Sequence, residues 1–167
     1  MDKIFIESDY QFDFTNSINV YESDKKSYND LPDVDFVVET EVNYFFIEIK
    51  NPDNIKAKEK SKSEFLSELH ENLHPYKIAD KFKSMLLRKW ALGADYEKPI
   101  LCVYILEFNK FTKTDRAKLK EKIFQRIPFS LNKKEFGGRK IFEKRFELLN
   151  IDEFKEMFST FTIEAAS

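Results

Sequence analysis

Strand-like patterns of hydrophobic and polar positions occupy three segments near the start of the chain. Residues 17–24 alternate with a period of two, and residues 33–40 and 43–50 are rich in β-branched and aromatic side chains. Both patterns are typical of strands, in which successive side chains point to opposite faces of a sheet. The stretches between the segments are turn-like, so the pattern predicts a three-stranded antiparallel meander.

From about residue 57 the apolar spacing becomes that of helices. Pro75 suits a first helical turn, and Gly93 suits a helix C-terminus. Residues 98–108 form a nearly continuous apolar run, as expected for a central strand covered on both faces. The order of elements predicts an α/β fold with a mixed central sheet, an N-terminal antiparallel meander and flanking helices. Helices are expected at residues 61–73, 74–93, 112–127 and 151–161, and a late strand at 139–150.

Composition limits the class of protein. The 167 residues suit one domain over residues 1–167, and a 42% hydrophobic content with 18 Phe is enough for a core. The three glycines allow neither a Walker loop nor a dinucleotide fingerprint, and the single Cys102 excludes a disulfide framework. No apolar run approaches the roughly 18–20 residues of a membrane span, and the N-terminus does not read as a signal peptide. We therefore expect a cytoplasmic protein with no membrane partner.

Charge is divided unevenly along the chain, although the formal net charge is only −2. Residues 1–54 carry 4 basic and 13 acidic side chains, a net of −9, and residues 55–167 carry 24 basic and 17 acidic, a net of +7. Such a division can place an acidic pocket beside a basic surface. Two ordinary solvated faces would give the same counts.

The hairpin formed by the second and third strands carries acids on one face. Glu48 and Lys50 share that face, because side chains alternate along a strand. A turn centred on Glu41 and Val42 pairs residues whose numbers sum to 83, which sets Asp35 opposite Glu48 with Cβ atoms roughly 4.5–5.5 Å apart. A turn centred one residue later pairs Asp35 with Lys50 and keeps it in the same cluster. The opposite face is apolar, with Phe45, Ile47 and Ile49.

Two facing carboxylates repel each other, and a sheet tolerates them when a cation lies between them. Carboxylate and carbonyl oxygens are hard ligands, which suits Mg²⁺ or Mn²⁺ better than zinc. Lys50 would bring an ammonium group to the same pocket, where it could orient an attacking water or stabilise charge on a phosphate oxygen. The chemistry that needs this set of groups is metal-assisted hydrolysis of a phosphodiester.

Asp35, followed after twelve residues by Glu48-Ile49-Lys50, resembles the active-site signature of the PD-(D/E)XK nuclease superfamily. The resemblance implies a restriction-endonuclease-like fold, a nucleic-acid substrate and Mg²⁺ or Mn²⁺ as cofactor. It also implies that Asp35, Glu48 and the backbone carbonyl of Ile49 bind the metal, and that Lys50 is catalytic. Asp33, after Pro32, spells the motif literally, but Asp35 has the better register with Glu48.

Many members of this superfamily carry one more acid on a helix before the meander. Residues 1–17 do not read as a helix, so Glu22 on the first strand is the candidate substitute. A catalytically inactive member of the same fold, acting as a binding or regulatory module, is the alternative function. A homodimer is also left open, because one such site cuts one strand.

The two histidines of the chain stand in His70-Glu71-Asn72-Leu73-His74, which fits the zinc metalloprotease pattern. That site needs both histidines within one regular helix, so that they point the same way. Pro75 directly follows His74 and disfavours helical continuation there. We therefore expect a helix break and keep the zinc peptidase only as a third alternative.

The helix expected at residues 74–93 has a basic stripe. Lys77, Lys81 and Arg88 fall on one face with Ser84 and are candidates for contacts to nucleic-acid phosphates. A solvated basic face is the alternative interpretation. A separate apolar stripe, expected to face the core, comprises Ala79, Phe82, Leu86 and Trp90.

Overall fold

The computed structural model describes residues 3–23, 31–54, 59–93 and 97–166. Within them a five-stranded central sheet has the order β3-β4-β5-β6-β7. The first three strands pair antiparallel, and β6 and β7 continue the sheet parallel to β5. The predicted meander and mixed α/β sheet are therefore confirmed. The strands are β3 (Asn19–Glu22), β4 (Phe36–Glu39), β5 (Tyr44–Lys50), β6 (Ile100–Leu106) and β7 (Phe142–Leu149).

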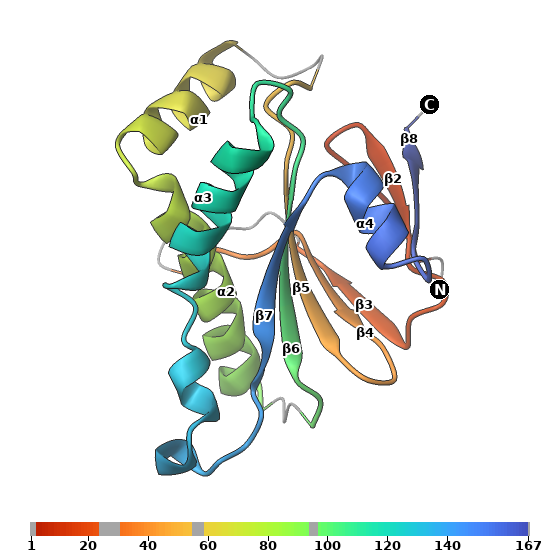
Figure 1. Cartoon of the computed structure of the whole chain (residues 1–167). Coiled ribbons are helices and arrows are strands. Elements are labelled where there is room, and N and C mark those ends of the chain that lie inside the picture. Colours follow the sequence, from red (N-terminus) through yellow and green to blue (C-terminus); the bar gives the residue numbers. More distant parts are fainter. Residues whose placement is uncertain (1–2, 24–30, 55–58, 94–96, 167) are drawn as a thin grey trace.

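Helices connect the parallel strands, as a parallel pair requires a long crossover. Helices α1 (Glu59–His70) and α2 (His74–Ala91) lie between β5 and β6, and α3 (Lys113–Phe124) lies between β6 and β7. A capping box starts α3: the hydroxyl of Thr112 accepts the backbone N–H of Asp115, and the Asp115 carboxylate accepts the N–H of Thr112. Figure 1 shows these three helices together on one face of the central sheet, where they form the helix layer.

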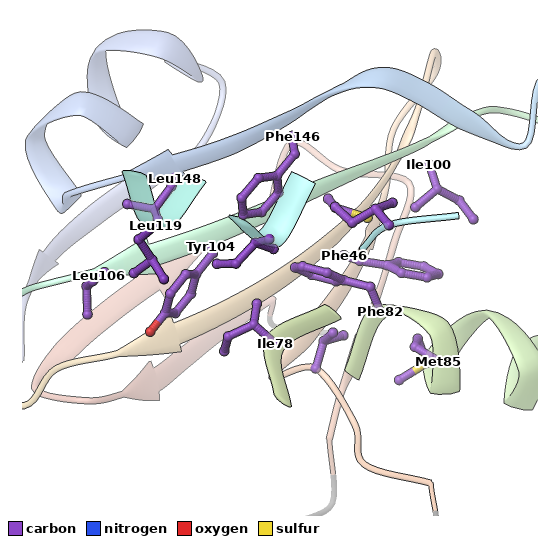
Figure 2. Packing of buried hydrophobic residues seen from close by; sticks show 14 of the residues in the cluster. Phe46, Ile78, Phe82, Met85, Ile100, Tyr104, Leu106, Leu119, Phe146 and Leu148 are labelled. Carbon is purple, nitrogen blue, oxygen red and sulfur yellow. The ribbon is translucent and has the colours of Figure 1, made fainter. Parts of the chain in front are cut away.

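The core between the helix layer and the sheet is built from alternate strand residues. All seven residues of β6 are buried, which agrees with its continuous apolar sequence. Figure 2 shows Ile78, Phe82 and Met85 of α2 packed toward Phe46 of β5 and the neighbouring strands. Phe46 therefore fixes which face of β5 looks toward the helices.

The opposite face of the central sheet is covered by a second layer, of which the sequence patterns predicted the helix but not the strands. It combines α4 (Ile151–Met157) with a small sheet of order β1-β2-β8, made of β1 (Ile4–Glu7), β2 (Tyr10–Asp13) and β8 (Thr162–Ala165). Figure 1 shows this small sheet and α4 on the side away from the helix layer. The helix expected at residues 151–161 is shorter, because the chain leaves α4 after Met157 to form β8. The core here is rich in phenylalanine, including Phe12, Phe14, Phe36, Phe45, Phe154 and Phe161.

Candidate acid-lysine site

The register of β4 and β5 brings two acids together. Phe36 pairs with Ile47 across the hairpin, and the same register extended by one residue sets Asp35 opposite Glu48. Because Ile47 packs in the core of the second layer and Phe46 in that of the helix layer, Glu48 faces the helix layer. The predicted register and the predicted faces of the strand are both confirmed. Asp35 and Glu48 are called the acid pair below.

Asp35 lies directly before β4. It is held by backbone N–H groups from β5 and from the residue that follows β3. One carboxylate oxygen accepts the backbone N–H of Ile49 at 2.7 Å, and the Asp35 carbonyl accepts the N–H of Ser23 at 3.0 Å. The carboxylate thus accepts a backbone hydrogen bond from β5 at a position just before β4 begins. These bonds fix the side chain beside Glu48 rather than in open solvent.

Glu48 is the more deeply buried acid, with only 4% of its surface exposed. Its Oε1 lies 2.5 Å from the Lys81 ammonium, whereas its Oε2 is buried and has no hydrogen-bond partner within the described part of the chain. Burial raises the pKa of Glu48 from 4.5 to about 8; the charge of Asp35 acts in the same direction, and that of Lys81 opposes it. A buried carboxylate oxygen without a partner is costly, so this atom marks a position where a cation would be stabilised.

Two lysines lie near the acid pair, and a third acid, Glu7, is close enough for its charge to act on Lys81. Burial alone would lower the pKa of Lys81, but the carboxylates of Glu48 and Asp35 outweigh it and raise that pKa, with a further contribution from Glu7. Lys50 is half-buried, and its charge reaches Glu48. The sequence patterns missed Glu7, which belongs to β1 of the second layer and comes near the site only through the tertiary fold.

A chain of polar side chains leads from the surface to the acid pair. Lys77 binds Glu68 at 2.5 Å, and Glu68 lies 3.3 Å from the Nδ1 atom of His74. The Nε2 atom of His74 lies 2.8 Å from the hydroxyl of Tyr104, and Tyr104 is the neighbour of Glu48 in the β5–β6 register. Burial, together with the charge of Glu48, raises the pKa of the Tyr104 hydroxyl well above its usual value of 10.0. The hydroxyl therefore stays protonated and available as a hydrogen-bond donor.

The basic stripe of α2 is turned toward acids of the protein itself. Lys81 binds Glu48, and Arg88 binds Asp33, the residue that spells the motif literally. Lys77, as described above, binds Glu68. The stripe exists as predicted, but each of the three bases already holds an internal ion pair.

The prediction that Trp90 packs in the core is wrong, because 71% of its surface is exposed. Ala79 and Phe82 of the same predicted stripe are buried. Glu22 pairs with Phe36 in the β3–β4 register and so lies on the second-layer face, opposite to Glu48. The structure therefore does not bring Glu22 to the acid pair.

The two histidines lie on different helices. Helix α1 ends at His70, Asn72 has a positive φ of 59°, and α2 begins at His74. His70 is exposed, whereas His74 is buried and contacts Phe65 and Tyr104. Burial lowers the pKa of His74, so its imidazole is neutral near pH 7. The expected helix break is confirmed, and the one-helix geometry of a zinc peptidase is absent from this segment.

The two carboxylates of the acid pair fit a hard divalent cation only if backbone carbonyl, water or substrate oxygens supply the other ligands. Among the described residues, no group of three or more His, Cys, Asp or Glu side chains is arranged to hold a metal ion. Mg²⁺ commonly uses one or two carboxylates, keeps several waters and takes substrate oxygens. The acid pair and the carbonyl of Ile49 would meet that requirement, with the unpartnered Oε2 of Glu48 as one ligand.

Comparison of the chain with models of known protein families, with curated proteins and with solved structures gives no match. Across the residues that the structure describes, every helix is too short or too polar to cross a membrane. The chemistry of the site is therefore inferred from its own residues and their arrangement.

Proposed function

We propose that the protein is a metal-dependent nuclease with a restriction-endonuclease-like fold, which hydrolyses phosphodiester bonds of nucleic acid at the acid pair. The observation that carries the proposal is the placement of Asp35 opposite Glu48, with a buried Glu48 oxygen that has no hydrogen-bond partner among the described residues. Asp35, Glu48 and the Ile49 carbonyl would hold Mg²⁺ or Mn²⁺. When bound, that ion would polarise the phosphoryl oxygen and lower the pKa of a bound water.

The remaining roles fall to groups of the chain. Lys50 lies on the same strand face as Glu48, two residues on, where its ammonium can stabilise negative charge on a phosphate oxygen during attack. The attacking water forms a new bond to phosphorus while the bond to the leaving sugar oxygen breaks. The attacking water releases a proton to solvent, and the leaving oxygen takes a proton from solvent. Tyr104 stands next to Glu48 on the neighbouring strand, and its hydroxyl is held by His74.

The proposal is tested by incubating the protein with plasmid, single-stranded DNA and RNA in Mg²⁺, in Mn²⁺ and in EDTA. Cleavage is expected only with metal, and Glu48→Gln and Lys50→Ala should each reduce its rate by roughly 10²- to 10³-fold. Lys60→Ala is the matched control for Lys50→Ala, because Lys60 lies on α1 with 83% of its side chain exposed. Cleavage that persists in EDTA, or in Glu48→Gln, would contradict the proposal.

A second candidate is a catalytically inactive module of the same fold that binds a partner. The favouring observation is that the chain itself supplies partners to both acids, through Lys81 to Glu48 and through the Ile49 N–H to Asp35. The same assay separates the two candidates. The module predicts nucleic-acid binding without cleavage in any metal, and binding unchanged in Glu48→Gln.

A further inference from the structure

Positive charge is concentrated in one stretch of the chain that is separate from the acid pair. Residues 110–145 carry 13 basic and 4 acidic side chains, a net of +9. Since the whole chain has a net charge of −2, the other residues sum to −11. The stretch comprises α3, the turns after it and the first half of β7, which Figure 1 shows next to one another at one side of the molecule. A polyanion would be attracted to this side of an otherwise acidic protein.

The most exposed part of this stretch is a loop, residues 133–140, called the basic loop below. It extends beyond the end of the central sheet, as the light blue segment in Figure 1 shows. Asn132 closes its base: the side-chain oxygen accepts the backbone N–H groups of Ile141 and Phe142 at 2.9 Å each, and the side-chain nitrogen donates to the Phe142 carbonyl at 2.6 Å. The two ends of the loop are thus joined, and a joined loop presents its side chains in a defined place.

The basic loop exposes an aromatic ring among cations. Phe136 has 58% of its surface exposed, and the loop's four basic residues are exposed as well. Gly137 and Gly138 follow with φ values of 92° and 68°, a conformation that favours glycine and turns the chain back toward β7. The four basic residues are Lys133, Lys134, Arg139 and Lys140.

The basic surface continues from the loop onto β7, which is an edge strand of the central sheet. Phe142 pairs with Ile100 and Phe146 with Cys102, so three residues of β7 stand opposite one of β6. Two residues of this bulge, Lys144 and Arg145, are exposed. A bulge turns side chains away from the regular ladder, and here it leaves two more cations exposed a few residues after the loop, Arg145 with Glu147 at 3.7 Å.

We propose that the basic loop binds single-stranded nucleic acid, with a base stacked on Phe136 and the surrounding cations contacting phosphates. Single strands are bound by basic surfaces carrying exposed aromatic rings, because an unpaired base offers its face to the ring. A duplex keeps its bases stacked and would use only the charges. An anionic membrane is a poorer fit, since interfacial binding uses a helix with a continuous apolar face, and here one ring stands on a short 3-10 turn.

The inference rests on the proposed function, because it names single-stranded nucleic acid as the substrate of the acid pair. Phe142, at the end of the loop, lies in register with Ile100 and so with Tyr44, four residues before Glu48 on β5. With a rise of about 3.3 Å per residue and about 4.8 Å between strands, the acid pair lies about 13 Å along and about 10 Å across the sheet from Phe142. A strand of several nucleotides is therefore needed to reach both places.

The test measures fluorescence anisotropy of a labelled 20-nucleotide oligo-dT in EDTA, from 50 to 200 mM salt. Phe136→Ala should weaken oligo-dT binding roughly ten- to a hundredfold, whereas Phe136→Trp, which keeps an aromatic ring, should bind as the wild type does. Phe136→Ala should hardly change binding to a 20-base-pair duplex. Lys133→Gln with Lys134→Gln should reduce the slope of log affinity against log salt by about 1.4. The control variant Lys60→Gln with Lys155→Gln removes the same charge from α1 and α4, outside the basic stretch, and should bind as the wild type does.

Equal oligo-dT affinity in the wild type and Phe136→Ala would overturn the inference, and so would tighter binding to vesicles of anionic lipid than to oligo-dT. Loop-dependent binding without metal-dependent cleavage leaves the inference standing as a binding site and removes the nuclease. Cleavage of single strands that is insensitive to the loop variants would support the nuclease and overturn the inference about the loop. Because Phe136 is exposed, neither phenylalanine variant should unfold the protein. Thermal unfolding of both variants checks this.

Discussion

Replacing Glu48 by glutamine should change how the stability of the protein depends on pH. In the folded protein burial raises the pKa of this carboxyl from 4.5 to about 8, so the folded state retains a proton that the unfolded chain releases earlier. Below about pH 4.5 both states are protonated, and the raised pKa costs nothing. Between pH 4.5 and 8 the wild type loses stability as the unfolded state deprotonates first. A shift of this size corresponds to at most about 5 kcal/mol at pH 8.

Glutamine has nearly the same shape and no charge to lose, so this part of the pH dependence should vanish in Glu48→Gln. The assay is urea unfolding at pH 5, 6, 7, 8 and 9, with the free energy of unfolding of each variant compared across pH. Lys81 loses its carboxylate partner in the variant, which lowers stability by its own amount. The double variant Glu48→Gln with Lys81→Met removes this effect.

The control is Glu64→Gln, the same chemical change on α1, where 60% of the glutamate side chain is exposed. Its free energy of unfolding should follow that of the wild type at every pH. The wild type and Glu48→Gln should converge toward pH 5 and separate by several kcal/mol in favour of the variant toward pH 8, once the constant offset is subtracted. Parallel curves for the wild type and Glu48→Gln would show that the Glu48 carboxylate is not the buried, proton-retaining group described above.

Two further predictions concern metal and histidine. The affinity for Mn²⁺, measured by calorimetry, should increase from pH 6 to pH 8. A carboxylate must be deprotonated to bind a metal, and the pKa of Glu48 is about 8. An affinity that does not depend on pH would place the metal elsewhere. His74→Ala should lower the free energy of unfolding by roughly 1–3 kcal/mol, because it leaves the buried Tyr104 hydroxyl without its partner, whereas His70→Ala should change it by less than about 0.5 kcal/mol. Equal effects of the two histidine variants in thermal or urea unfolding would refute this reading of the segment.

The meander and its register were predictable because the two faces of the hairpin differ in sequence, one carrying acids and the other only apolar residues on β5. A slip of one residue would carry the charged Glu48 into the phenylalanine-rich core of the second layer and turn Ile47 and Ile49 toward the helix layer, so the sequence pattern favours one register. The central strand β6 was predictable for a related reason, as burial on both faces needs a continuous apolar run. In these elements the local sequence and the tertiary environment agree.

The small sheet of the second layer was not predictable from local patterns. Strand β2 pairs with β8, which joins residues 10–13 to residues 162–165. Both strands are four residues long, too short for alternation to stand out, and their pairing depends on a partner at the other end of the chain. Glu7 was missed for the same reason, because only this packing brings β1 near Lys81.

Helical spacing revealed which residues of α2 share a stripe but not what the stripe faces. Lys81 and Arg88 lie at the border between the core and the surface, where acids of the first strands can reach them. Trp90 has the spacing of the apolar stripe, but it stands in the last turn of α2 and is exposed there. Periodicity contains no information about where a helix projects past the sheet that it covers.

The charges at the acid pair explain why the substrate-binding surface is expected elsewhere on the molecule. The charges of Asp35, Glu48 and Glu7 act on Lys81, and that of Lys50 acts on Glu48, so with every group ionised these five groups keep one negative charge. A nucleic-acid strand is repelled by that charge unless a cation occupies the site or Glu48 is protonated. An attractive surface some distance away, such as the basic loop, can hold the strand without weakening the affinity of the acids for a cation. Under the proposed function, this separation of charges would let the protein bind a metal ion at the acid pair and a polyanion at the basic loop.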